Sequence, residues 1–391
     1  MKRILFVIPS LKNGGGVIRS LENFLTIIPS GKYSIDVLSL GYCPDDKVKL
    51  SNCRILDYDF LLNALTNSYS LTKGYRYRYF VYIFKLILKA ASKLKCRRWI
   101  TRTIFYNKTK KYSNYDIVIA FQEGDSSRFV SLFESVKKVA WIHCDYKVRR
   151  GNIGISEYDV YSRFDLINSV SEFTKSNFDA IYPQLKNKSS YIYNFLDVKF
   201  ILNKSSEQIT DLVVDDSKYV LISIGRISQV KQFSVIPDII AELLKRNITC
   251  FKWILMGVLY DKEEMEKINS KIEKYNITKE NFEYIGKRMN PYPYIRRSDL
   301  LISVSHSEAC PFVVNEARVL GVPVISNNYP SIYEFIENGV NGYICPNESM
   351  PDLLSDLFSD KSKMETLQKS TSEHPYNNQQ IQDKFLKVLE M

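Results

Sequence analysis

Short apolar segments alternate with amphipathic helical patterns along this chain, in two successive blocks. Helices between short buried strands are typical of parallel, doubly wound sheets. In the first block the apolar segments predict strands at 3–8, 34–40, 116–120, 138–142, 166–170 and 191–193. In the second they predict strands at 219–224, 252–256, 282–285, 299–304 and 322–326. We therefore predict an α/β protein with two Rossmann-like domains.

The length of 391 residues suits two domains of this class better than a single core. We place the N-terminal domain at 1–198 and the C-terminal domain at 199–376, with the polar stretch 202–218 as the connection between the blocks. The last helical pattern, 377–390, has no strand partner and is predicted to pack back on the first domain. Two such domains facing each other would form a cleft, and open α/β sheets bind ligands at the carboxyl ends of their strands.

The richest strand end follows residues 299–304. It reads His306-Ser307-Glu308-Ala309-Cys310-Pro311-Phe312-Val313-Val314-Asn315-Glu316. Pro311 suits the first turn of a helix, whose free N–H groups form an anion site together with the helix dipole. The N–H groups concerned lie around Cys310, Phe312 and Val313. Glu308 and Glu316 would flank this site and could each accept two hydroxyl hydrogen bonds from a sugar, although a solvated glutamate and a dipole-stabilised acid are the simpler alternative.

A second strand end, after residues 219–224, carries two cations. It reads Gly225-Arg226-Ile227-Ser228-Gln229-Val230-Lys231-Gln232. Gly225 permits a tight turn, and Arg226 and Lys231 flank the loop. Two cations beside a helix-start anion site are what a diphosphate requires. Either strand end alone is weak evidence, but in one domain the two support each other.

These motifs together carry a resemblance to a known family. Gly225-Arg226-x4-Lys231, Glu308-x7-Glu316-Ala317 and Gly321-Val322-Pro323-Val324-Ile325 resemble glycosyltransferase family 4, the group 1 glycosyltransferases of bacterial polysaccharide assembly. The resemblance covers 219–346, including Asn338-Gly339-x-Asn341-Gly342, and matches the N-terminal half more loosely. It implies a GT-B fold and a retaining, metal-independent hexosyltransferase-type enzyme that uses a nucleotide-sugar donor and no cofactor.

The resemblance also implies roles for single residues. Arg226 and Lys231 would bind the donor diphosphate. Glu316 would hold the ribose hydroxyls, and Glu308 the hydroxyls of the transferred sugar. The other predicted donor-binding residues are Gly15, Gly16, Gly225, Lys287, Arg288, Cys310, Phe312 and Val313. The sequence departs from the family at Gln232, where a glycine often stands, and at Val17-Ile18-Arg19, where Glu-Arg is usual.

The N-terminal domain contributes a histidine, His143, directly after the strand at 138–142. The resemblance places it against the donor sugar near the anomeric carbon, whereas the simpler alternative is a structural histidine at a strand end. Glu123 and Asp145 are predicted to face the acceptor. The predicted catalytic residues are His143, Glu308, Arg226 and Lys231. No nucleophile is evident opposite Glu308, so the departing diphosphate oxygen is expected to take the acceptor proton.

Positive charge is concentrated in one window. Residues 60–115 contain 13 lysines and arginines and no acid, while the rest of the chain has 41 basic and 43 acidic residues. Lys85, Lys89 and Lys93 recur every four residues and predict a stripe on an amphipathic helix that lies on an anionic membrane. The full predicted patch is Arg78, Lys85, Lys89, Lys93, Arg97 and Arg98. A core-packed helix with a solvated lysine face is the alternative. We predict no nucleic-acid partner, because no nucleic-acid module accompanies the charge.

The cysteines and the apolar segments bear on location. The seven cysteines are scattered, without a C-x-x-C pair, which fits a reducing cytosol and no structural zinc. No apolar run reaches the roughly 18 residues of a membrane span. We predict a cytoplasmic enzyme, peripheral on the inner face of the membrane, that acts on a lipid-linked or membrane-proximal glycan in polysaccharide biosynthesis such as capsule or O-antigen. The alternative is a non-catalytic GT-B scaffold that partners another glycosyltransferase or binds an anionic polymer.

Overall fold

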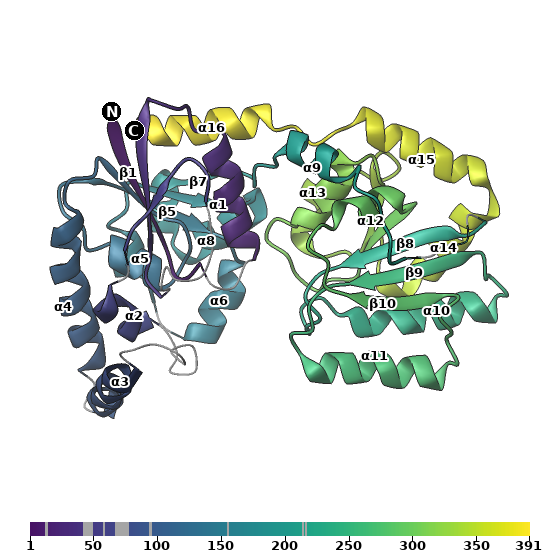
Figure 1. Cartoon of the computed structure of the whole chain (residues 1–391), viewed down its shortest axis with the longest axis horizontal. Helices are drawn as coiled ribbons and strands as arrows, with labels where there is room; N and C mark the ends of the chain where they lie inside the picture. The colour runs from purple at the N-terminus through teal and green to yellow at the C-terminus, as the bar shows by residue number, and fades with distance from the viewer. Residues whose placement is uncertain are drawn as a thin grey trace. The chain divides into compact units, whose positions relative to one another are not determined.

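The computed structural model describes residues 1–11, 15–41, 50–57, 59–66, 78–93, 96–154, 156–212, 215 and 217–391. The chain forms two compact units, one of residues 1–195 with 379–391 and the other of residues 196–378 (Figure 1). The first unit ends three residues before the predicted boundary at 198. Each unit has its own parallel sheet with helices packed on it, so the predicted α/β class with two Rossmann-like domains is confirmed.

The sheet of the first unit has the order β3-β2-β1-β4-β5-β6-β7. Its strands are β1 Lys2–Ile8, β2 Tyr33–Ser39, β3 Arg54–Ile55, β4 Ile117–Ala120, β5 Lys137–Ile142, β6 Leu166–Ser169 and β7 Ser189–Tyr191. Its helices are α1 Gly16–Thr26, α2 Phe60–Thr66, α3 Arg78–Lys93, α4 Arg97–Thr109, α5 Asp125–Val130, α6 Tyr146–Ile153, α7 Tyr158–Tyr161, α8 Glu172–Ile181 and α16 Gln379–Glu390. Strand β7 ends at Tyr191, where the predicted strand begins. Strand β3 was not predicted; Arg54 on it is held by two hydrogen bonds to Asp36 of β2, at 2.9 and 2.8 Å.

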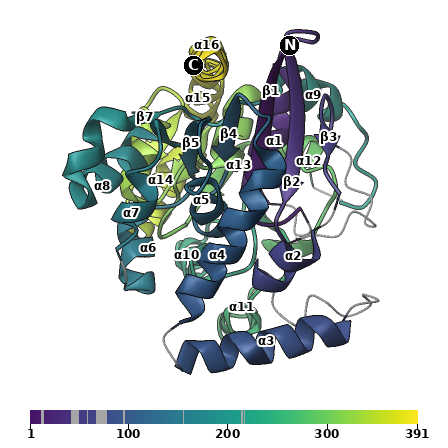
Figure 2. The ribbon, with the colours of Figure 1, turned by 90° about the vertical axis from the view of Figure 1, so that its left-hand side faces the viewer.

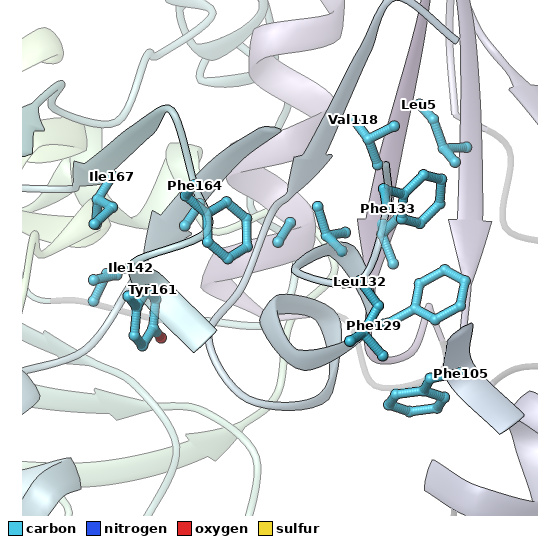
Figure 3. Close-up of a cluster of buried hydrophobic side chains, with 14 of the residues drawn as sticks. Leu5, Phe105, Val118, Phe129, Leu132, Phe133, Ile142, Tyr161, Phe164 and Ile167 are labelled. Atoms are coloured by element: carbon cyan, nitrogen blue, oxygen red, sulfur yellow. The ribbon is translucent and has the colours of Figure 1, made fainter. Parts of the chain in front are cut away.

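Apolar side chains hold the first unit together on both faces of its sheet. On one face, Figure 3 shows Leu5 and Val118 of adjacent strands beside Phe129 and Phe133, with Phe105 of α4 below them. On α16, Phe385 stacks on Phe24 of α1 with the ring centroids 4.3 Å apart. The C-terminal helix therefore packs on the first unit, as the sequence predicts.

The sheet of the second unit has the order β10-β9-β8-β11-β12-β13. Its strands are β8 Tyr219–Ile224, β9 Phe251–Met256, β10 Phe282–Gly286, β11 Leu300–Ser303, β12 Val324–Ser326 and β13 Gly342–Ile344. Its helices are α9 Val198–Lys204, α10 Ile236–Lys245, α11 Lys262–Lys274, α12 Tyr292–Arg297, α13 Phe312–Val319, α14 Met350–Ser359 and α15 Lys361–Glu373. After β8 the chain adds β9 and then β10 on one side of that strand. It then returns and adds β11, β12 and β13 on the other side. The topological switch point, where sheets of this kind bind ligands, thus lies between β8 and β11.

One expectation for the second unit is wrong, and one strand was not predicted. The stretch 202–218 is not a connection between units: it lies inside the second unit, because α9 packs on α12 and α13 and Asp211 accepts a hydrogen bond from Tyr294. Strand β13 was not predicted, although it follows a motif that carries the resemblance. A Cβ on Gly342 would lie 2.0 Å from the carbonyl oxygen of Val324, so this motif brings β13 against β12.

Candidate functional site

An ion pair joins the two chemically rich strand ends of the second unit. The Lys231 ammonium, in the loop after β8, donates to Oε1 of Glu308, in the loop after β11. Both side chains are 19% exposed. Ser305 donates to the same oxygen at 3.0 Å, and the His306 N–H donates to the Val230 carbonyl at 2.8 Å. The two loops are thereby fixed against each other at the switch point.

Arg226 lies at the tip of the same β8 loop. Its side chain is exposed, and the guanidinium carbon is 5.2 Å from the centroid of the Tyr260 ring, in a cation–π contact. Tyr260 follows β9, the strand next to β8. Tyr260 was not among the predicted site residues, because its contact with Arg226 depends on β8 and β9 being neighbours.

The start of α13 differs from the prediction. Pro311 is the N-cap residue, with ψ 111°, and the helix begins at Phe312 rather than at the proline. No side chain caps this helix start, and its first turn contains no acid. The first-turn N–H groups of a helix lack intrahelical acceptors, so this end of α13 keeps the character of an anion site.

The predicted sugar-binding residues around α13 differ in exposure. Glu316 is only 2% exposed, and Cys310 is buried as well. Phe312 and Val313 are half-buried, as is Glu308. Glu316 is therefore part of the packed face of α13, while Glu308 lies in the loop that precedes it.

Gln232, which stands where the family often has a glycine, adopts a left-handed backbone conformation with φ 51°. This conformation costs a residue with a side chain about 1–2 kcal/mol, and glycine nothing. We expect Gln232→Gly to leave the free energy of unfolding unchanged or to raise it by up to about 1 kcal/mol, measured by urea denaturation. The matched control is Gln229→Gly, in the same loop without a positive φ. That variant should lose about 0.5–1 kcal/mol; equal losses at both positions would contradict the argument.

The predicted donor-binding residues Lys287 and Arg288 differ in their exposure and contacts. Lys287 is exposed. The Arg288 guanidinium donates to Asp211 at 2.5 Å and also to the Ile285 carbonyl. Arg288 thus anchors the 205–212 segment, a contact that the sequence pattern did not indicate.

In the first unit, the predicted acceptor-facing acids have contacts of their own. Glu123 accepts the backbone N–H of His143 at 2.9 Å. Asp145 is the N-cap of α6 and accepts from the Lys147 N–H and from the Asn177 amide, both at 2.9 Å. Gly15 and Gly16 are exposed at the start of α1. These residues belong to the other unit, so their predicted place beside the donor stays a prediction.

The His143 side chain is half-buried. It lies 5.1 Å, centroid to centroid, from the ring of Phe121, and its Nε2 is buried without a hydrogen-bond partner among the described residues. Burial lowers the pKa of His143 to about 3, against a smaller opposing effect of the Phe121 carbonyl. The imidazole is therefore neutral at physiological pH.

The low pKa of His143 predicts an acid-sensitive fold. Between the unfolded value near 6.5 and the folded value of about 3, the unfolded chain binds more protons, so stability rises with pH and is lost as pH falls. His143→Gln should flatten this dependence by up to about 1.4 kcal/mol per pH unit, measured by urea denaturation across the window. His374→Gln, at an exposed histidine, is the control and should keep the wild-type slope. Parallel slopes for wild type and His143→Gln would refute the prediction.

The basic window folds into α3 and α4, and α3 packs on α2 and α4 (Figure 2). Val81, Leu88 and Ala91 form the buried face of α3. The opposite face is exposed and apolar. It consists of Tyr79, Phe80, Tyr82, Ile83, Leu86 and Ile87, each between 46% and 77% exposed. We call it the α3 apolar face. None of the helices in the described part of the chain is long and apolar enough to cross a membrane.

The predicted lysine stripe flanks this face and is not uniform. Lys89, Lys93, Arg97 and Arg98 are exposed. Lys85 is half-buried, and its pKa is lowered first by burial and then by repulsion from Arg97. Lys85 therefore lies closer to the packed face of α3 than the other two lysines of the stripe, and its place in a membrane patch stays a prediction. The Arg78 side chain lies outside the described part.

Comparisons with known proteins give the following matches. A family model described as "Glycosyl transferases group 1" matches residues 204–378. N-acetyl-alpha-D-glucosaminyl L-malate synthase of Bacillus anthracis is 27% identical over 195 residues, 49% of this chain and 47% of that protein. The chain thus spans about half the length of this relative. An uncharacterized glycosyltransferase of Haemophilus influenzae is 20% identical over 91% of this chain and 90% of its own.

The same fold occurs in solved structures. HepE of Anabaena, in complex with UDP and glucose, matches over 100% of both chains with a TM-score of 0.72 and 13% identity. WaaG, described as a glycosyltransferase involved in lipopolysaccharide biosynthesis, matches over 99% of both chains with a TM-score of 0.65 and 12% identity. Likeness at this level of identity shows the fold, and it confirms the predicted GT-B class.

Proposed function

We propose that this chain, whose residues 204–378 match the model of the group 1 glycosyltransferases, transfers a sugar from a nucleotide-sugar donor to a glycan acceptor with retention of the anomeric configuration. The donor binds at the switch point of the second unit, and a lipid-linked or membrane-proximal glycan is the acceptor. The product belongs to a polysaccharide such as capsule or O-antigen. HepE binds UDP and glucose according to its description, so uridine diphosphate sugars are the first donors to test.

One observation carries this proposal: Arg226, Lys231 and Glu308 come from the ends of the adjacent strands β8 and β11. An ammonium has three N–H donors, so Lys231 can keep its bond to Glu308 and still donate to a phosphate oxygen. The hydrogen bonds that Glu308 accepts from Lys231 and Ser305 both go to Oε1. Its Oε2 is therefore the oxygen proposed to accept from sugar hydroxyls.

The chemistry follows from this arrangement. The bond between the anomeric carbon and the diphosphate oxygen breaks, and the acceptor oxygen bonds to that carbon on the same face. The departing diphosphate oxygen takes the acceptor proton. The protein lowers the barrier by stabilising the negative charge that grows on the diphosphate, through Arg226, Lys231 and the start of α13. Neutral His143 is proposed to contact the donor sugar without proton transfer.

Donor screening tests the proposal. Calorimetry with uridine, guanosine and adenosine diphosphate sugars should find one donor that binds wild type and binds Arg226→Gln more weakly. Release of the nucleoside diphosphate in the presence of acceptor then measures transfer. The scaffold alternative predicts that no donor binds and that Glu308→Gln changes nothing.

The enzyme is proposed to need neither metal nor cofactor. Cationic side chains and helix-start amides would then carry the charge stabilisation that a divalent ion supplies in other transferases. Transfer should continue unchanged in excess EDTA. Loss of activity in EDTA, restored by Mg²⁺ or Mn²⁺, would overturn this part of the proposal.

We also propose that the α3 apolar face lies on the cytoplasmic side of the membrane, with Lys89, Lys93, Arg97 and Arg98 at anionic headgroups. The support is the exposure of six large apolar side chains on one helix face flanked by cations. In liposome flotation, Ile83→Glu/Ile87→Glu should abolish binding to vesicles that contain phosphatidylglycerol. Binding that survives this change would refute the membrane contact.

A further inference from the structure

A cavity of about 680 Å³ lies in the first unit, and none of the predicted donor-binding, acceptor-binding or catalytic residues lines it. Trp99, Arg102 and Tyr106 of α4 form one wall. Lys138, near the start of β5, and Arg163, shortly before β6, contribute to the other wall. The cavity therefore lies at the amino edge of the sheet. His143 follows the carboxyl end of β5, about 16 Å along the strand from Lys138 at 3.3 Å per residue.

Two of the three cations of this cavity donate hydrogen bonds to backbone carbonyls. Arg102, Lys138 and Arg163 make no ion pair with any carboxylate in the described part of the chain. Lys138 donates to the Phe133 carbonyl at 3.0 Å, and Arg163 donates to the Asp159 carbonyl at 3.2 Å.

Two acids lie near these cations. Glu134 lines the cavity and accepts from the Tyr106 hydroxyl at 3.4 Å. Asp165 accepts the backbone N–H of Lys138 at 2.8 Å. The pKa of Lys138 is lowered, mainly by burial and also by Arg163, against the attraction of Asp165 and Glu134. A partly buried ammonium that lacks a carboxylate partner is stabilised by an anion that enters the cavity.

The aromatic side of the cavity indicates which anion. Trp99 is 70% exposed and lines the cavity from the first turn of α4, directly after α3. Indole side chains favour the boundary between lipid and water, and α3 presents its apolar face to solvent nearby in the same unit. A phosphate with an attached acyl chain would satisfy both the cations and the apolar surface.

We infer that this cavity binds the phosphate headgroup of an anionic membrane lipid, with Arg102, Lys138 and Arg163 around the phosphate and Trp99 at the glycerol and acyl boundary. The inference adds a second, lipid-specific site to the proposed membrane contact of the α3 apolar face. It is independent of the donor site, so failure of the transferase proposal leaves it standing.

Trp99 makes the test specific, because it lines the cavity and its fluorescence responds to a ligand bound there. The chain has three tryptophans, and the other two, Trp141 and Trp253, are fully buried. Full-length protein is titrated with phosphatidylglycerol vesicles, phosphatidylcholine vesicles and inorganic phosphate, while tryptophan emission is recorded. We expect a blue shift with phosphatidylglycerol that is absent in Trp99→Phe.

Matched variants separate the cavity from general surface charge. Lys138→Gln/Arg163→Gln should need about tenfold more phosphatidylglycerol than Lys137→Gln/Lys186→Gln, which removes two exposed lysines of the same unit outside the cavity. Lys138→Arg should bind like wild type. If the first double variant fails to fold, Arg102→Gln on the surface of α4 replaces it, with an expected loss of about fivefold.

Three results would overturn the inference. One is equal lipid requirement for the cavity double variant and the exposed double variant. Another is equal binding of phosphatidylcholine and phosphatidylglycerol vesicles. The third is a combination of two observations: inorganic phosphate shifts the Trp99 emission in a way that depends on Lys138, and vesicle binding does not depend on Lys138. That combination would assign the cavity to a free anion. If Ile83→Glu/Ile87→Glu abolishes flotation while the cavity variants match their control, only the α3 proposal survives.

Discussion

Lys231→Met is expected to lower kcat/KM for the donor about a hundredfold, corresponding to about 3 kcal/mol of lost transition-state stabilisation. The reason is that the ammonium lies in a partly enclosed loop at the switch point, where a fixed cation needs no reorganisation as charge grows on the diphosphate. The measurement is steady-state release of nucleoside diphosphate with the donor found by screening. Lys287→Met, at an exposed lysine of the same unit, is the control for loss of one positive charge.

A double variant measures how much stability the unpaired Glu308 carboxylate costs in Lys231→Met. Removal of Lys231 leaves the Glu308 carboxylate without its ion-pair partner, which costs about 1–3 kcal/mol of folding free energy. Lys231→Met/Glu308→Gln removes both charges and should recover most of that stability. It should not recover transfer. Recovery of activity together with stability would show that Lys231 acts only on folding.

Gly257→Ala is expected to destabilise the second unit by about 3 kcal/mol or more and to abolish donor binding. A Cβ at this position would lie 1.6 Å from the Gly225 carbonyl oxygen, which is backbone and cannot turn aside. The segments after β8 and β9 run side by side there, with the Gly225 N–H on the Met256 carbonyl at 3.0 Å and the Ile227 N–H on the Val258 carbonyl at 2.9 Å. Any displacement of Gly225 also moves Arg226, its neighbour in the loop.

Gly151→Ala provides the matched control for this prediction. Gly151 lies in α6, and a Cβ there meets nothing within 4 Å. Alanine in a helix should stabilise the protein by up to about 1 kcal/mol. Urea denaturation measures both variants, and calorimetry measures donor binding. A Gly257→Ala protein that is as stable as Gly151→Ala and still binds donor would refute the close-approach argument.

The sequence was informative wherever a pattern is local. Strand β8 has the predicted bounds, and the other predicted strands in the second unit overlap β9 to β12 closely, because an apolar run between amphipathic helices has one stable solution in an α/β fold. The helix after Glu308 was expected, and only its first residue was misplaced. Strands β3 and β13 were missed because neither is an apolar run: β3 begins with Arg54 and β13 begins with Gly342.

Other features depend on which strands are neighbours. Lys231 and Glu308 are 77 positions apart, and their ion pair exists because β8 and β11 are adjacent in the sheet. The same applies to Gly225 and Gly257, whose backbones meet because β9 lies on the other side of β8. Tyr260 and the Arg288 contact with Asp211 were missed for the same reason.

The sequence by itself determined two doubly wound domains, the family motifs and the residues at the strand ends, since these follow from periodicity and from short-range order along the chain. Tertiary structure alone decided which of these residues meet, and that Lys85 is half-buried while the α3 apolar face is exposed. It also decided that three cations, without an ion-pair partner among the described residues, line one cavity. The physical reason is that contacts between distant segments depend on strand order and helix packing, which hydrophobic periodicity does not encode.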